Sequence, residues 1–187
     1  MSGRTTDGVS DTRAGTWKET PLNQKLQWTV EIVVDAPLKR VWEVADDITL
    51  IPQYHPEVDK VDLIAGQAKH SLGTKYQCHI LEGRRAGSCV EEVVAYEPER
   101  MVTTSMVSDT WGIERMLTNY RVEATVSRHT ETSTILKFQG FYEPVGLKYR
   151  LLNALFLRRV FRRRSLAVMK GIKRLTEGKA DVVAAAR

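Results

Sequence analysis

The chain has 187 residues, of which 42% are hydrophobic and 27% are charged, a composition typical of one globular domain with short tails. This composition excludes low-complexity and collagen-like proteins. Two cysteines are too few for a disulfide scaffold, and no charged segment followed by an apolar run opens the chain, so we expect a reducing, cytoplasmic location. No stretch reaches the roughly 20 apolar residues that a membrane-spanning helix needs.

The net charge of +5 is concentrated near the C-terminus. Between Val145 and Glu177 there are ten basic residues and one acidic residue, a balance of +9, which leaves −4 for the rest of the chain. Such a basic segment can attract phosphate groups of lipid or nucleic acid. It can equally be a solvated helix face that only aids solubility.

The pattern along the chain predicts one domain over residues 21–178, between a disordered tail at 1–20 and a flexible tail at 179–187. The alternating, β-rich run Trp28 to Val34 predicts a strand, which Asp35-Ala36-Pro37 ends. A short helix should follow Pro37, because apolar residues recur there at helical spacing. Two prolines limit residues 47–56 to a second short helix and a loop.

From Val58 to Tyr142, short β-rich segments alternate with turn signals, which predicts an antiparallel meander ended by Pro144. If Gly83-Arg84 forms a two-residue turn, Cys78 and Cys89 face each other on neighbouring strands. Glu91 and Glu92 should point to opposite faces of their strand, which is the wrong geometry for a carboxylate pair.

Residues Val145 to Glu177 contain no proline, and Gly178 comes directly after them, so we expect one long helix over this segment. A heptad-like seam predicts the face that lies against the sheet. It comprises Leu147, Leu151, Ala154, Arg158, Phe161, Ser165, Val168, Ile172 and Leu175.

This order of elements predicts an α+β fold in which a curved antiparallel sheet of about seven strands wraps around the long C-terminal helix, with two short helices after strand one. Three local segments then resemble a known family: Val33 to Trp42 with its Asp-Ala-Pro, the segment Ile51 to Val58 with Tyr-His-Pro, and the turn Glu97-Pro98-Glu99-Arg100. Over residues 26–177 the chain resembles the START-like helix-grip superfamily, in particular its SRPBCC branch of polyketide cyclases/dehydrases and lipid-transport proteins.

The resemblance implies a cavity between sheet and helix that binds a hydrophobic small molecule, such as a lipid, a polyketide or an isoprenoid, for carriage or sequestration. Strand alternation and the family's layout together suggest its lining, although each of these side chains could equally be plain core. The lining would comprise Tyr54, His55, Tyr76, Cys78, Met106, Trp111, Tyr120, Phe138, Leu151, Leu155 and Arg158.

The alternative function is an enzyme of the polyketide aromatase/cyclase or dehydratase type, in which His55, Tyr120 or Arg158 assists proton transfer or enolate stabilisation. His55 could instead be a loop histidine packed between two prolines. An arginine at position 158 on the buried seam must reach solvent, pair with an acid, or bind an anionic head group. A third interpretation is an interaction or stress-response module with a vestigial cavity.

Cys78 and Cys89 could form a metal site together with His55 or His79, but their spacing matches no zinc signature. We therefore expect that the thiols are buried and that the protein holds no metal and no cofactor. Arginines 159, 162, 163 and 164 suggest peripheral contact with an anionic membrane. Nucleic acid is not expected, because no stacking aromatics accompany the basic residues. The chain should be a monomer or a homodimer.

Overall fold

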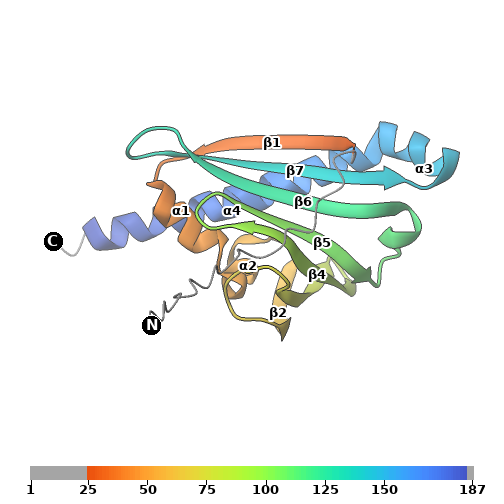
Figure 1. Ribbon diagram of the computed structural model, residues 1–187, viewed down its shortest axis with the longest axis horizontal. Helices are drawn as coiled ribbons and strands as arrows, with labels where there is room; N and C mark the ends of the chain where they lie inside the picture. The colour runs from red at the N-terminus through yellow and green to blue at the C-terminus, as the bar shows by residue number, and fades with distance from the viewer. Residues whose placement is uncertain (1–24, 185–187) are drawn as a thin grey trace, which may run out of the picture.

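The computed structural model describes residues 25–184, with side chains described for residues 25–178, so the predicted tail at 1–20 lies outside it (Figure 1). The strands are β1 (Leu26–Val34), β2 (Val58–Ala65), β3 (Lys75–Glu82), β4 (Arg85–Glu97), β5 (Met101–Asp109), β6 (Leu117–Arg128) and β7 (Thr134–Pro144). The helical segments are α1 (Leu38–Ala45), η1 (Ile48–Leu50), α2 (Ile51–Tyr54), η2 (Ile113–Arg115), α3 (Gly146–Leu152), η3 (Asn153–Leu157) and α4 (Arg158–Ala184). None of the helices described is long and apolar enough to cross a membrane.

The seven strands form one antiparallel sheet in the order β1-β7-β6-β5-β4-β3-β2, which confirms the predicted meander. Strands β3 and β4 are joined at Gly83 and Arg84, and the register of this hairpin sets Cys78 opposite Cys89, as predicted. Helix α4 runs along the sheet beside β1, with α1 and α2 packed against it (Figure 1). The helix-grip architecture expected from the sequence is therefore present.

The core lies between α4 and the face of the sheet that we call the inner face. Alternation along each strand sends every second side chain to this face, where large aromatic and aliphatic groups meet the helix. Its fully or almost fully buried members include Trp28, Val34, Val93, Leu136, Tyr142, Met169 and Ile172.

Helix α4 passes unusually close to α2 at Gly171. A Cβ atom on this residue would lie 2.0 Å from the backbone oxygen of Tyr54. Only glycine permits this approach, which holds Tyr54 in the core at the C-terminal end of α2. The contact therefore fixes the position of one predicted site residue.

The predicted helix seam is wrong in its first part. Leu147 and Leu151 are 81% and 61% exposed, and Ala154 is exposed too, whereas Val168 and Ile172 are buried as expected. The reason is the π-helical turn η3, which inserts one residue and so rotates α3 by about 100° relative to α4. The helix also continues through Gly178 to Ala184 instead of stopping there.

Candidate functional site

A half-buried carboxyl group occupies the inner face of β4. Glu91 stands opposite Tyr76 of β3, whose hydroxyl donates a hydrogen bond of 2.8 Å to Glu91 Oε2. Burial raises the pKa of Glu91, while hydrogen bonds from Tyr76 and Thr104 act in the opposite direction. A carboxyl group with a raised pKa inside an apolar wall is suited to exchange a proton with a bound molecule.

Three tyrosines lie near this carboxyl group. Burial raises the pKa of Tyr54, Tyr76 and Tyr120, and the nearby negative charge of Glu91 raises each of them further. The three phenols therefore stay protonated at neutral pH and can donate hydrogen bonds. Tyr120 also stacks on Tyr142, with ring centroids 5.7 Å apart.

The two thiols on the same face are poor candidates for nucleophiles. Cys78 and Cys89 are both free, and the hydrogen bond between them together with burial raises the pKa of Cys78. A thiol with a raised pKa is a weak nucleophile and a weak metal ligand. His79 cannot join them, because it lies on the other face of β3 and bonds Asp62 at 2.7 Å.

His55 makes its contacts away from the Glu91 cluster. Its Nδ1 accepts a hydrogen bond of 3.2 Å from the Glu57 amide, and burial and the charge of Arg164 lower the pKa of His55 to about 4. The ring is therefore neutral at pH 7 and cannot serve as a proton donor there. Arg164 is itself held by Glu57, at 3.2 Å, and by Glu82.

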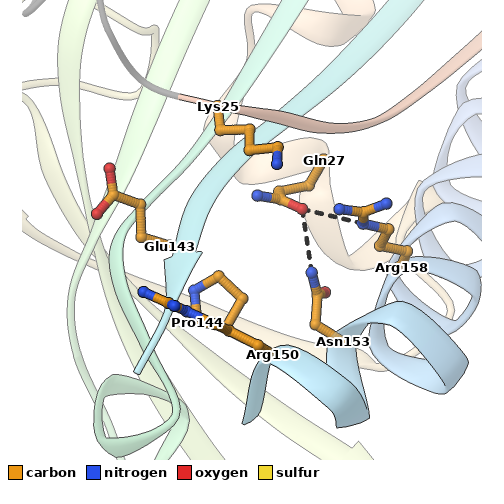
Figure 2. A pocket seen from close by; sticks show the side chains of 7 residues that line it. All are labelled: Lys25, Gln27, Glu143, Pro144, Arg150, Asn153 and Arg158. Atoms are coloured by element: carbon orange, nitrogen blue, oxygen red, sulfur yellow. Dashed lines mark hydrogen bonds between the residues drawn. The ribbon is translucent and has the colours of Figure 1, made fainter. Parts of the chain in front are cut away.

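A second polar network closes one end of the inner face (Figure 2). Asn153 Nδ2 and Arg158 Nε both donate hydrogen bonds of 3.0 Å to Gln27 Oε1, and the Tyr142 hydroxyl donates one of 2.7 Å to Asn153 Oδ1. Gln27 Nε2 in turn donates to the Tyr142 carbonyl at 2.8 Å. The network explains how Arg158 is tolerated on the helix seam: it pairs with an amide oxygen rather than with an acid.

Two local irregularities build this network. A register shift between Leu26 and Trp28 turns Gln27 inward beside Trp28, so two consecutive residues of β1 are buried. The π-helical turn begins at Asn153, which is only 2% exposed, and such turns are frequent at functional sites.

Next to this network lies a pocket of about 470 Å³, which we call the mouth pocket. Residues from the start of β1, the end of β7 and the first turns of the long helix line it. In Figure 2, Lys25 and Arg158 point toward Gln27, whereas the Arg150 guanidinium lies beside Pro144. Three of its residues are cationic and one is acidic, so it carries an excess of positive charge. Its lining comprises Lys25, Gln27, Glu143, Pro144, Arg150, Asn153 and Arg158.

The predicted lining residues fall into three groups. Met106 lies on the inner face opposite Glu91, and Phe138 is a core residue opposite Val30. Trp111 packs over Gly87, where an added Cβ would meet the indole at 2.3 Å. Leu151 and Leu155 are exposed, so the expectation that they line an interior cavity is wrong, because the π-helical turn rotates this part of the helix away from the sheet.

Sequence reasoning missed Glu91 and most of the mouth pocket. The alternation of Glu91 with Cys89 and Val93 was a usable signal for its inward direction, and Glu92 does point outward, where it pairs with Lys75 at 3.3 Å. The mouth pocket had no comparable signal, because it depends on an irregular strand and an irregular helix.

A further buried cluster lies behind Tyr76. The ring of His70 contacts Tyr76 edge-on, with centroids 5.8 Å apart, and its Nδ1 lies 3.8 Å from Asp46 Oδ1. Asp46 also accepts a hydrogen bond of 3.1 Å from the Tyr96 hydroxyl. Burial lowers the pKa of His70 to about 4, so this histidine is neutral in the folded protein at pH 7.

Several solved structures share this fold. The ginseng major latex-like protein 151 from Panax ginseng is 15% identical, with a TM-score of 0.64 over 78% of this chain and 93% of that one. The Zhui aromatase/cyclase from a Streptomyces species is 14% identical, with a TM-score of 0.67 over 84% and 96%. Norcoclaurine synthase from Thalictrum flavum, in complex with dopamine and hydroxybenzaldehyde, is 16% identical, with a TM-score of 0.64 over 92% and 98%.

At these identities the structural likeness establishes the fold alone. No curated protein sequence matches the chain. The family model described as polyketide cyclase / dehydrase and lipid transport, however, matches residues 25–177, which include the whole sheet, the Glu91 cluster and the mouth pocket. The chain therefore belongs to the polyketide cyclase/dehydrase and lipid transport family, whose helix-grip fold holds small hydrophobic ligands.

Proposed function

We propose that the protein carries or sequesters a hydrophobic small molecule with an acidic head group, such as a lipid, a polyketide or an isoprenoid acid. The apolar part lies between the inner face and α4, and the head group lies in the mouth pocket. The observation that carries this proposal is the charge of the pocket, whose lining has three cations, Lys25, Arg150 and Arg158, and a single carboxylate, Glu143. A buried or half-buried carboxylate or phosphate would find charge-assisted donors there.

The burial pattern of the inner face supports the apolar part of the proposal. Met106 and Tyr120 keep partial exposure on this face, so both remain open to contact with a small molecule. The pocket's volume of about 470 Å³ also falls in the usual range for small-molecule sites, roughly 300–1,000 Å³.

Two fluorescent probes with the same aromatic rings test this proposal. Anilinonaphthalene sulfonate carries an anionic group, and phenylnaphthylamine does not. We expect both to bind, and we expect the double variant Arg150→Gln/Arg158→Gln to weaken binding of the sulfonate by about tenfold or more while leaving phenylnaphthylamine almost unchanged. Arg128→Gln, in the exposed β6–β7 hairpin, is the matched control. Equal binding of the sulfonate to all three proteins would reject the head-group site.

Glu91 favours a second candidate function, an enzyme of the aromatase/cyclase or dehydratase type acting on a polyketide chain. In this case the Glu91 carboxylate, held by the Tyr76 hydroxyl, removes the α-proton of a hydroxylated chain, and the Tyr120 phenol stabilises the resulting enolate oxygen. Glu91 then returns the proton to the departing hydroxyl, which leaves as water. Arg158 holds the acidic end of the chain. His55 takes no part as an acid, because the pKa of His55 lies near 4.

The two functions separate on one substitution. If the protein is an enzyme, Glu91→Gln abolishes water loss from a poly-β-keto thioester, followed by mass spectrometry, while probe affinity is kept. The matched control is Glu92→Gln on the outer face, which should leave both properties intact. If the protein is a carrier, the wild type itself gives no turnover and Glu91→Gln changes affinity only.

A further inference from the structure

The first part of the long helix presents an apolar surface to solvent. Large aliphatic and aromatic side chains protrude here over three helical turns, and Leu147 is the most exposed of them. We call this surface the α3 apolar face; it comprises Leu147, Leu151, Leu155, Phe156 and Val160. Contiguous exposed apolar side chains of this size mark an interaction surface.

Basic side chains continue the same side of the helix. Leu147, Leu151 and Leu155 are succeeded at intervals of four residues by Arg159 and Arg163, all of them exposed, and this spacing places successive residues on one side of a helix. Lys148 and Arg162 flank them and are exposed as well. Arg164 is different, because its ion pairs with Glu57 and Glu82 turn it toward the sheet, and it is therefore not part of this surface.

The charge of this surface selects among partners. A second copy docking by the same face would cover arginines with a surface that has no acidic residue between Val145 and Arg164 to pair with them, which is unfavourable. A nucleic acid would meet aliphatic side chains where base-stacking aromatics are needed, since Phe156 is the only aromatic residue of the face. An anionic lipid surface complements both features, because the apolar side chains enter the boundary between head groups and acyl chains while the arginines contact phosphate.

We infer that the α3 apolar face docks the protein on an anionic lipid bilayer, with the helix lying in the interface. In Figure 1, α3 lies at the opposite end of the molecule from the C-terminal end of α4, beside the end of β7. Arg150 and Asn153, from the same helical segment, line the mouth pocket, so docking brings the pocket close to the bilayer. Docking by this face requires no ligand in the mouth pocket.

Co-sedimentation of the full chain with vesicles tests the docking. We expect binding to vesicles of phosphatidylcholine mixed with phosphatidylglycerol, weaker binding to phosphatidylcholine alone, and release at high salt. Each arginine near an anionic bilayer strengthens binding about fivefold, so Arg159→Gln/Arg163→Gln should bind roughly 25-fold more weakly. Leu151→Ser/Phe156→Ser should also lose binding, whereas the controls Arg128→Gln and Leu72→Ser, exposed elsewhere, should not.

Circular dichroism and thermal melting establish that each variant is folded, so that a loss of binding reports on the surface. Docking by this face is refuted if the wild type does not bind anionic vesicles, or if Arg159→Gln/Arg163→Gln and Leu151→Ser/Phe156→Ser bind them as well as the wild type does. It is also overturned if sedimentation equilibrium shows a dimer that Leu151→Ser/Phe156→Ser disperses, since the face would then be a contact between copies. Failure of the probe experiment in the mouth pocket leaves this result unchanged, so the two proposals can be separated.

Discussion

Replacing Gly171 by alanine tests the close approach of α4 to α2. The added Cβ would lie 2.0 Å from the backbone oxygen of Tyr54, and 2.8 and 2.9 Å from its carbonyl carbon and Cα. An ordinary contact needs 3.4 Å or more. Because all three neighbours are backbone atoms, no side-chain rotation relieves the clash, and one helix must move by more than an ångström.

The expected cost follows from two opposing contributions. Overpacking a core typically destabilises a protein by about 1–3 kcal/mol, whereas the better helix propensity of alanine stabilises the helix by about 1 kcal/mol relative to glycine. The backbone clash at 2.0 Å places the overpacking cost in the upper part of that range, so we expect Gly171→Ala to lower the free energy of unfolding by about 1–2 kcal/mol. For a chain of this size each kcal/mol lowers Tm by roughly 2–4 °C. Because Tyr54 borders the Glu91 cluster, phenylnaphthylamine affinity should fall as well.

Urea denaturation followed by tryptophan fluorescence measures the free energy of unfolding. Gly178→Ala is the matched control. Gly178 lies in the same helix, but nothing lies within 4 Å of the Cβ it would gain. This variant should be as stable as the wild type or slightly more stable. If Gly171→Ala proved equally benign, the close packing of α2 on α4, and with it the placement of Tyr54, would be refuted.

Three other predictions concern buried polar groups. Burial raises the pKa of Glu91 above its unfolded value, so the contribution of Glu91 to stability falls as pH rises through the folded pKa. Glu91→Gln should therefore be more stable than the wild type at neutral pH and lose this advantage in acid. Urea titrations measure this difference, and Glu92→Gln should show no such trend. Asn153→Ala leaves the Tyr142 hydroxyl without its acceptor and should lower the free energy of unfolding by about 1–3 kcal/mol. A decrease of less than a few tenths of a kcal/mol, measured by calorimetry, would contradict the network of Figure 2. The pKa of His70 falls from 6.5 to about 4 on folding, so between these pH values the unfolded chain binds more protons than the folded protein. The free energy of unfolding therefore drops as pH falls through this window, by on the order of 3 kcal/mol at most. His70→Phe, which keeps an aromatic edge against the neighbouring ring, should flatten this part of the pH–stability curve.

Strand alternation alone predicted much of the sheet and of its inner face. The two-residue turn at Gly83 and Arg84 determines the register of the β3–β4 hairpin, which is why the facing of Cys78 and Cys89 could be read from local sequence. The same period places Glu91 inward. That Glu91 meets Tyr76 there, and that burial changes its chemistry, depends on neighbours that alternation does not specify.

The long helix shows where periodicity fails. Its apolar spacing from Leu147 to Leu175 assumes 3.6 residues in every turn, but the turn η3 contains one more, and Leu147 and Leu151 consequently face solvent. No pattern of residue types indicates this turn, since its stability comes from Asn153 meeting Gln27 and Tyr142 across the fold.

The sequence by itself thus determined the order of the elements, the register of the β3–β4 hairpin and the excess of basic residues in the final helix, because these follow from local propensities and from composition. Only the tertiary structure decided which charges are free to meet a partner. It directs Arg164 into ion pairs with the sheet and Arg158 onto Gln27, and it leaves Arg159 and Arg163 exposed beside an apolar surface. The mouth pocket likewise exists only because strand β1 is irregular at Gln27 and the helix is irregular at Asn153, two positions that are distant in sequence and in contact in the fold.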